Sequence, residues 1–397
     1  MPSAVILTGA TGFLGGHLLA ALVEQGRRVI VLGRARPVRS LAERLDDLLS
    51  WFGLAARRHQ VESIEADLGQ PRCGLSEERY QAVCANRGPM VHCASDTGFS
   101  ERRRREISEA NLDGVGRILD LAVAGHAPFF CYVSTAFVGR VGGGRCLEEL
   151  VASAHHVNVY EETKALAEHQ VVDRCQRERL SYAVVRPSIV YGDSRTGRST
   201  RFNALYHPVR SLALLREIYL KDLRSHGGER AQALGIALRP DCVLKLPLRV
   251  FVARRGHLNL IPIDYFVAAV ERILLRGAPG IYHLTSDSPV ALSDLADYCQ
   301  FFLKLTGLQI VEGTPDREQL NPPEALFHRF VLPYLPYLSD VRSFDRGQAD
   351  RATGGLQPPR FDYQIFERCM RYAVSVDWSE PFRSCHGADT RGRISTP

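Results

Sequence analysis

The hydrophobic residues at the start of the chain predict a buried strand followed at once by a helix. Ala4 to Leu7 is a continuous apolar run, which is typical of a strand buried on both faces. Phe13 to Leu22 repeats its apolar residues with helical periodicity. Between these segments stand Gly9, Gly12 and Gly15. We therefore expect a strand, a glycine turn and a helix in immediate succession.

Further apolar runs alternate with amphipathic segments as far as residue 192, and this alternation predicts a parallel sheet. Leu41 to Phe52, for example, has the pattern of an amphipathic helix. Strands that alternate with helices favour an α/β fold, a Rossmann-type doubly wound parallel sheet. The further strands that we expect are residues 28–32, 61–68, 90–95, 129–133 and 182–192.

The pattern changes after residue 192. Residues 193–259 predict short helices alternating with loops rich in Arg, Gly and Pro. Residues 261–275 then predict a helix, residues 280–284 a strand and residues 292–305 a second helix. We expect parts of 261–285 to return to the main sheet.

The glycine turn predicts a binding site for a dinucleotide. In such a site Gly9 allows the tight turn, Gly12 lets the backbone approach a pyrophosphate, and Gly15 lets the helix pack closely on the strand. The start of the helix would present unpaired N–H groups and the positive end of its dipole to the phosphates. The alternative is a glycine turn with no ligand.

The end of the second predicted strand indicates which dinucleotide is bound. An acidic residue at this place would hold the ribose 2′-hydroxyl of NAD, but Arg34 stands there, with Arg36 and Arg39 behind it. Arginine suits a 2′-phosphate, so the sequence predicts NADP(H). The alternative is a cluster of surface arginines before a helix.

Two later strand ends have residues suited to the same cofactor. Asp67 can accept a hydrogen bond from the adenine amino group, although a helix-capping Asp is the alternative. Ala94 lies among small residues at the end of the fourth strand, where the backbone can lie against the cofactor.

Tyr160 and Lys164 are the candidate catalytic pair. Their spacing of four residues places both side chains on one face of a helix. A lysine ammonium one turn away would lower the pKa of the tyrosine, which could then exchange a proton with a substrate oxygen near neutral pH. A hydroxyl from the end of the fifth strand, Thr135 or Ser134, would hold the substrate carbonyl oxygen. The alternative is an exposed Tyr–Lys pair on a helix.

Composition narrows the classes of function. The chain has 397 residues, of which 45% are hydrophobic and 24% charged, and its net charge is +6. No basic stripe is interleaved with aromatic residues, so nucleic acid is not an expected partner. The ten cysteines include no C-x-x-C pair, and no metal site is expected. No apolar run reaches about 18 residues, and the first strand begins near Met1, so we expect neither a transmembrane segment nor a signal peptide, and a cytoplasmic location.

Four consecutive arginines, Arg102 to Arg105, precede a predicted helix. Such a run is usually a solvated face. A docking patch for an acidic or phosphate-bearing partner is the alternative.

Taken together, these motifs resemble an extended short-chain dehydrogenase/reductase, and within that superfamily the fatty acyl-CoA reductase and thioester reductase group. The resemblance rests on six stretches, which are Thr8 to Gly15, Gly33 to Ala35, Val133 to Val138 (V-S-T-A-F-V), Tyr160 to Glu168 (Y-x-x-T-K-A-L-A-E), Arg186 to Ser188 (R-P-S) and Gly192 to Gly197 (G-D-S-x-T-G). It covers residues 4–305 and is faint beyond them.

The resemblance implies the roles of individual residues. Thr135, Tyr160 and Lys164 are the implied catalytic residues, and Asn111 is implied to support the geometry of the site. The predicted cofactor-binding residues are Gly9, Thr11, Gly12, Phe13, Leu14, Gly15, Arg34, Asp67, Leu68, Ala94, Ser134, Lys164, Pro187, Ser188 and Ile189.

The resemblance also implies the reaction and the division into domains. The expected reaction is hydride transfer from NADPH to an acyl thioester, carried by CoA or an acyl carrier protein, which gives an aldehyde or, after a second hydride, an alcohol. We predict an NADP-binding domain over 1–192, a smaller, mostly helical substrate-binding region over 193–383 and a disordered tail over 384–397.

Three other interpretations stay open at this point. An extended short-chain dehydrogenase/reductase that acts on a nucleotide-sugar or a sterol has the same fingerprint, Tyr and Lys. A non-catalytic NADP sensor would also have the fold, although the intact Tyr160 and Lys164 count against it. Residues 205–215 are apolar on one side with arginines on the other, so they suit either a peripheral membrane contact or a core helix.

Overall fold

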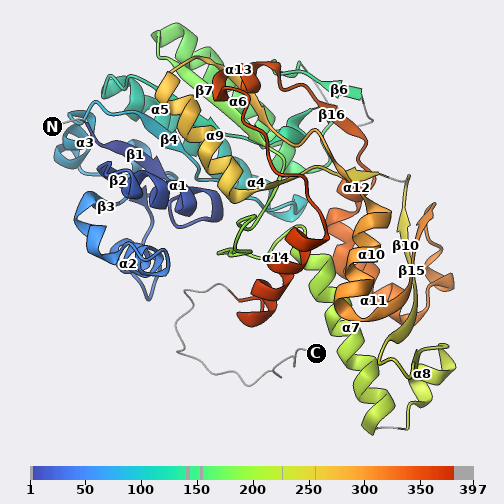
Figure 1. The fold of residues 1–397 in the computed structure, drawn as a ribbon. Coiled ribbons are helices and arrows are strands. Elements are labelled where there is room, and N and C mark those ends of the chain that lie inside the picture. Colours follow the sequence, from blue (N-terminus) through green and yellow to red (C-terminus); the bar gives the residue numbers. More distant parts are fainter. Residues whose placement is uncertain (1–2, 140–143, 153–154, 226, 255, 380–397) are drawn as a thin grey trace. The chain divides into compact units, whose positions relative to one another are not determined.

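The computed structural model describes residues 3–139, 144–152, 155–225, 227–254 and 256–379. The predicted tail over 384–397 lies outside these residues. The chain forms two compact units (Figure 1). Among the described residues, the first contains those within 3–190, 263–285 and 342–358, and the second contains those within 191–262, 286–341 and 359–379.

The first unit is built on a parallel sheet of seven strands, as the apolar runs predict. Its strand order is β13-β7-β5-β4-β1-β2-β3, and every neighbouring pair is parallel. This order confirms the expected doubly wound Rossmann-type fold. The strands are β1 (Val5–Thr8), β2 (Val29–Gly33), β3 (Val61–Glu65), β4 (Met90–His92), β5 (Phe130–Val133), β7 (Tyr182–Pro187) and β13 (Gly280–Leu284).

Helices pack on both faces of this sheet. One face carries a continuous apolar core formed with α3 (Glu77–Cys84), α5 (Gly114–Ala124) and α6 (Val159–Glu178). The other face is covered by α1 (Phe13–Glu24), α2 (Leu41–Trp51) and α9 (Ile263–Arg276). Because both faces are buried, the strands are apolar throughout instead of alternating. The unit also contains α4 (Arg104–Ser108), β6 (Gly144–Cys146), β16 (Arg342–Phe344) and α13 (Gly347–Thr353), and β8 (Ile189–Tyr191) begins in it.

A segment from late in the chain, residues 342–358, completes the first unit. Its strand β16 pairs in parallel with β6. The buried carboxylate of Glu148 accepts hydrogen bonds from the backbone N–H groups of His283 (2.7 Å) and Ala349 (3.1 Å). One carboxylate thereby ties the last strand of the sheet to α13. The sequence pattern did not predict this return.

The second unit combines helices with a small sheet. Its helices are α7 (Tyr206–Ser225), α8 (Glu229–Ala233), α10 (Leu292–Leu303), α11 (Pro322–Val331), α12 (Leu335–Leu338) and α14 (Tyr363–Ser375). Its sheet has the order β15-β10-β9, formed by β9 (Ala237–Leu238), β10 (Leu244–Val252) and β15 (Leu305–Glu312). Shorter strands are β11 (His257–Leu258), β12 (Leu260–Pro262) and β14 (Val290–Ala291).

The expectation of short helices and loops over residues 193–259 is wrong in two places. Residues 206–225 form one 20-residue helix, and residues 244–252 form a nine-residue strand. Side chains of β10 alternate between buried and more exposed positions, as in a strand that is buried on one face. Pro247 argues against a strand in the sequence, but it lies where the register shifts between Lys245 and Leu248, and a bulge tolerates proline.

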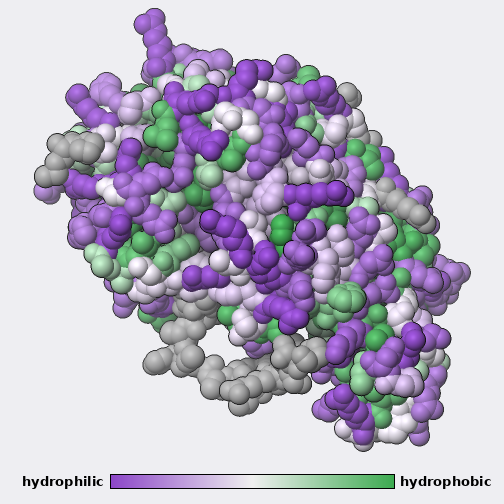
Figure 2. Space-filling model, viewed as in Figure 1, coloured by the Kyte–Doolittle hydropathy of each residue, from purple (hydrophilic) through white to green (hydrophobic). Residues whose placement is uncertain are grey.

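Helix α7 contains most of the segment that was open to a membrane-surface interpretation. Its residues Val209, Leu212 and Leu215 are buried, which favours the alternative of a core helix. No helix in the described part of the chain combines the length and the apolar character that a membrane crossing requires. On the face shown in Figure 2, apolar residues are scattered among polar ones.

Candidate functional site

The glycine turn has the geometry that its sequence predicts. Gly9 has a φ of +73°, and a Cβ there would lie 2.6 Å from the backbone nitrogen of Ala94. A Cβ on Gly15 would lie 2.3 Å from the carbonyl oxygen of Gly9. Helix α1 begins after Gly12, and no side chain of the described residues caps it. Its first N–H groups, from Phe13 onward, are therefore available to an anion.

The arginines after β2 differ in what they contact. Arg39 forms an ion pair with Asp47. Arg34 and Arg36 are exposed, and neither guanidinium has a partner among the described residues. Two cations are thus unpaired at the strand end that reads the 2′ position of the adenosine ribose in a dinucleotide fold.

The residues predicted beside adenine already take part in hydrogen bonds of the protein. The carboxylate of Asp67 accepts the N–H of Gly69 (3.0 Å), and the carbonyl of Leu68 accepts a guanidinium N–H of Arg117 (2.9 Å). The N–H of Ala94 donates to the hydroxyl of Thr8 (3.3 Å). Asp67 thus closes a turn instead of capping a helix, and the adenine contact stays a prediction.

The three predicted catalytic residues lie together. Thr135 follows the end of β5, while Tyr160 and Lys164 lie in the first two turns of α6, whose N-cap is Asn158. The side chains of Tyr160 and Thr135 are hydrogen-bonded. The ammonium of Lys164 donates to the carbonyl of Val133 at 2.7 Å. Both side chains of α6 are thereby directed to the carboxyl end of β5.

The pKa of Tyr160 differs from the expectation. Burial raises it well above the usual value, the nearby Glu161 raises it further, and the hydrogen bond from Thr135 lowers it. Lys164 does not depress it, because the ammonium is directed to the Val133 carbonyl and not to the phenol. Burial also lowers the pKa of Lys164 to about 8. Tyr160 therefore stays protonated at neutral pH, as a proton donor must.

Three buried hydroxyls lie at the carboxyl ends of the adjacent strands β5, β7 and β13. They belong to Ser134, Ser188 and Thr285, and none of them has a hydrogen-bond partner among the described residues. The backbone of these strand ends is still hydrogen-bonded, since the N–H of Ser134 donates to the carbonyl of Val185 and the N–H of Ser188 donates to the carbonyl of Leu284. Buried polar groups are normally satisfied, so unsatisfied hydroxyls at this edge fit a bound polar ligand.

Thr285 is a candidate that the sequence analysis missed. It directly follows a predicted strand, residues 280–284, and it is fully buried. A signal was available: once that strand is placed beside 182–187, its end must lie beside Ser188. Pro187 and Ile189 flank Ser188 at this edge, and their cofactor contacts stay predictions.

Asn111 connects two elements beside the candidate catalytic residues, and these contacts suit the supporting role that the resemblance implies. It lies in a π-helical turn, Glu109–Asp113, and is buried. Its amide accepts the N–H of Asp96 (2.8 Å) and donates to the hydroxyl of Thr163 (3.0 Å). It therefore connects the loop after β4 to α6, between Tyr160 and Lys164.

The arginine run is mostly neutralised. Arg103 pairs with Asp96, Arg104 with Glu162, and Arg105 with Glu109. Of the four, Arg102 alone has no side-chain partner in the described chain. These pairs favour a solvated face over a docking patch.

Cys93 lies close to Lys164 but is not suited to act as a nucleophile. Burial raises the pKa of Cys93 to about 12, so it is a poor nucleophile despite its place near Lys164. No group of His, Cys, Asp or Glu in the described ranges is arranged to hold a metal ion.

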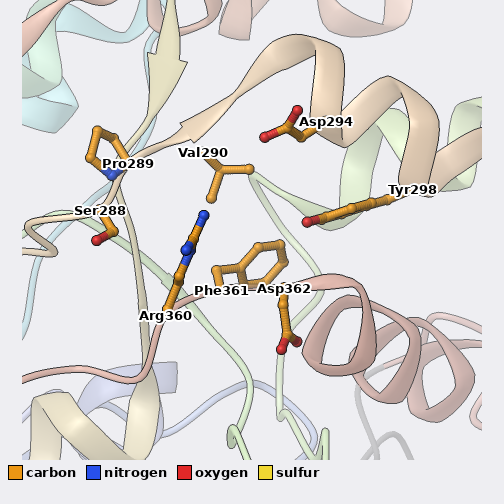
Figure 3. Close-up of a pocket in the computed structure, with 8 residues that line it drawn as sticks. All are labelled: Ser288, Pro289, Val290, Asp294, Tyr298, Arg360, Phe361 and Asp362. Atoms are coloured by element: carbon orange, nitrogen blue, oxygen red, sulfur yellow. The ribbon is translucent and has the colours of Figure 1, made fainter.

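The second unit contains a separate pocket with a cavity of about 470 Å³ (Figure 3). It is lined by Ser288, Pro289, Val290, Asp294, Tyr298, Arg360, Phe361 and Asp362. The carboxylate of Asp362 caps α14 by accepting the N–H of Ile365 (2.9 Å). None of the residues predicted for the site lines this pocket.

Known proteins resemble the chain in sequence. The family model described as "Male sterility protein" matches residues 7–270. The mouse protein "Fatty acyl-CoA reductase 1" (Mus musculus) is 29% identical over 226 residues, which are 47% of this chain and 43% of that protein. The chain spans 4% to 43% of the length of the curated relatives that it matches.

Solved structures share the fold. The terminal R domain from the myxalamid PKS-NRPS biosynthetic pathway has a TM-score of 0.71 at 23% identity, over 95% of this chain and 91% of that one. The UDP-glucuronic acid 4-epimerase from Bacillus cereus, in complex with NAD, has a TM-score of 0.64 at 14% identity, over 95% of this chain and 99% of that one.

Proposed function

The chain belongs to the male sterility protein family of extended short-chain dehydrogenases/reductases, and we propose that it reduces an acyl thioester at the expense of NADPH. The observation that carries the proposal is the cluster of Thr135, Tyr160 and Lys164 at the carboxyl end of β5. The acyl group would be carried by CoA or by an acyl carrier protein, because relatives named for acyl-CoA reduction and for PKS-NRPS pathways match the chain.

Several groups of the chain would suit the successive parts of the cofactor. The open N-terminus of α1 suits the pyrophosphate, and the unpaired Arg34 and Arg36 suit a 2′-phosphate. The unsatisfied hydroxyls of Ser134 and Ser188 suit the polar groups of the nicotinamide end. When bound, NADPH would supply the hydride that reduces the thioester carbonyl carbon.

The protein residues would handle the charge and the proton. As the carbonyl carbon becomes tetrahedral, negative charge develops on its oxygen, and the hydroxyls of Thr135 and Tyr160 would stabilise that charge by hydrogen bonds. Tyr160 would then give its proton to the oxygen. The C–S bond of the resulting hemithioacetal breaks to release a thiol and an aldehyde. A second round on the aldehyde would give an alcohol.

Lys164 would bind the cofactor and would not take part in the proton transfer itself. Its ammonium carries three N–H donors, of which one is held by Val133. A remaining donor can reach a ribose hydroxyl of the cofactor.

The direct test is to supply the purified protein with NADPH or NADH and with panels of acyl-CoA and acyl-carrier-protein thioesters. We expect thioester-dependent oxidation of NADPH with formation of an aldehyde or an alcohol. Tight NADPH binding without turnover of any thioester would overturn the proposal. A nucleotide-sugar or sterol-type substrate, or a sensor, would then be the better interpretation.

A further inference from the structure

The ammonium of Lys164 is held by strand β5 and not by a carboxylate. Its Nζ donates to the carbonyl of Val133 and lies 4.6 Å from the centroid of the Tyr132 ring. Lys164 and Tyr132 are both buried. Within the described ranges, no acidic side chain forms an ion pair with Lys164.

The carboxylate whose charge acts on Lys164 is already engaged. Glu168, one turn beyond Lys164, accepts two hydrogen bonds from Arg186 of β7, at 2.9 and 2.5 Å. Both side chains of this ion pair are buried. Arg186 thus neutralises Glu168, which leaves the Lys164 cation to the Val133 carbonyl and the Tyr132 ring.

We propose that Tyr132 is a positioning residue, whose ring face holds Lys164 as an ammonium and directs one of its two remaining donors toward the cofactor ribose. A cation over an aromatic face is stabilised most when both groups are desolvated, as they are here. The ring of His92 lies nearly parallel to that of Tyr132, at an interplanar angle of 18°, and limits its rotation. The ribose contact rests on the proposed function, but the effect on the charge of Lys164 does not.

The carboxylate of Glu161, one turn before Lys164, accepts the backbone N–H of Val157 (3.1 Å), and the further titratable groups that face Lys164 are uncharged. On the β4 side, burial lowers the pKa of His92 to about 3 and raises that of Cys93 to about 12. On β5 and α6, burial keeps the phenols of Tyr132 and Tyr160 protonated. Because burial lowers the pKa of Lys164 to about 8, a further fall of about one unit would leave roughly half of this lysine uncharged at pH 7.

The composition of the chain makes a direct measurement practical. The four lysines are Lys164, Lys221, Lys245 and Lys304. Selective ¹³Cε-lysine labelling therefore gives four side-chain NMR signals, and a Lys164→Arg variant identifies that of Lys164. A pH titration of this signal reports its pKa without any need for turnover.

The test compares Tyr132→Phe, which keeps the aromatic face, with Tyr132→Leu, which removes it. We expect the pKa of Lys164 to stay near the wild-type value in the Phe variant and to fall by about one unit in the Leu variant. The pH above which NADPH affinity declines should move by the same amount. Unchanged signals from the other three lysines would show that the fold is kept, and Tyr132→Met replaces Tyr132→Leu if that variant does not fold.

Equal pKa values in the Phe and Leu (or Met) variants would overturn the role of Tyr132. A titration as expected, in a wild-type protein that reduces no thioester, would support the role of Tyr132 while overturning the proposed function. The two failures are therefore distinguishable.

Discussion

Tyr160 is the residue on which the proposed chemistry depends most directly. Its phenol bonds to Thr135 and stays protonated at neutral pH because burial raises its pKa. We expect Tyr160→Phe to lower kcat for thioester reduction by about 10²- to 10⁴-fold, the usual contribution of a positioned proton donor. NADPH affinity, measured by quenching of protein fluorescence, should change little.

Tyr182→Phe is the matched control, since Tyr182 begins β7 and lies at the amino end of the strand, away from the carboxyl ends that carry the candidate site. This variant should keep the wild-type rate. A Tyr160→Phe enzyme of normal kcat would mean that another group protonates the carbonyl oxygen.

Arg34 should decide the choice of cofactor. Its guanidinium is exposed and unpaired at the end of β2, so it is free to meet a 2′-phosphate. We expect Arg34→Ala to raise the KM for NADPH by about 10- to 100-fold, because the variant would lose a hydrogen bond between charged groups. The KM for NADH should stay nearly unchanged. Arg102→Ala removes an unpaired arginine far away in the sequence and should alter neither. A similar rise for both cofactors after Arg34→Ala would contradict a role in reading the phosphate.

At this scale the sequence predicts which residues gather but not where their polar atoms are directed. The four-residue spacing places Tyr160 and Lys164 on one face of α6, as the structure has them. The lysine has a flexible four-carbon stem, however, and spacing does not determine whether it turns to the phenol or to β5. The hydrogen bond to Val133 depends on tertiary packing, and so does the unexpected rise in the pKa of Tyr160.

Two strands of the sheet hold buried histidines that make the fold sensitive to acid. Burial lowers the pKa of His92 on β4 and of His283 on β13 to about 3. In the unfolded chain each has an ordinary pKa near 6.5, so the unfolded state binds protons first as the pH falls. We expect the free energy of unfolding, from urea titrations, to drop by about 3 kcal/mol between pH 7.5 and 5.5 through these two groups.

Replacement of one histidine distinguishes the loss of stability caused by His92 and His283 from a loss caused by other groups that bind protons. His283→Gln should remove about half of the drop, whereas His59→Gln, at an exposed position, should leave it intact. The same pH dependence in all three proteins would mean that other groups titrate.

At the scale of elements, the sequence predicts the buried strands best, because a strand covered on both faces is apolar throughout. It predicts β10 poorly, although its residues alternate, because Pro247 argues against a ladder that a bulge in fact accommodates. Asn111 shows a similar limit: its residue type suits a supporting role, but its bond to Thr163 depends on a π-helical turn that no local pattern signals.

The first unit is assembled from three separate stretches of chain. Strand β13 and helices α9 and α13 are supplied by residues 263–285 and 342–358. We expect a fragment of residues 1–192 to lack cooperative thermal unfolding and to bind NADPH at least tenfold more weakly than the full chain. Without β13, the edge of β7 is unpaired and Glu148 loses its N–H partners. A folded fragment of normal affinity would show that the late segments are dispensable.

At the scale of the whole molecule, the sequence predicts the class of fold and the return of 280–284 to the sheet. It does not predict the return of residues 342–358. These residues carry no long apolar run. They are fixed by backbone contacts such as the hydrogen bond from the N–H of Ala349 to Glu148, and almost any residue type can supply a backbone N–H. The place of residues 342–358 in the first unit is therefore known from their tertiary contacts and not from a sequence pattern.

Because β13 and residues 342–358 are synthesised late, the first unit stays incomplete while the intervening chain is translated. A ribosome that adds about 5 to 20 residues per second needs roughly 10 to 30 s to proceed from the end of β7 to residue 358. Until residue 284 is added, which takes about 5 to 20 s of that interval, β13 is incomplete and the nascent chain presents the unpaired edge of β7, a template for wrong strand pairing. Slow translation of the intervening stretch would prolong this exposure, so codon choice there bears on the yield of active protein and on its demand for chaperones.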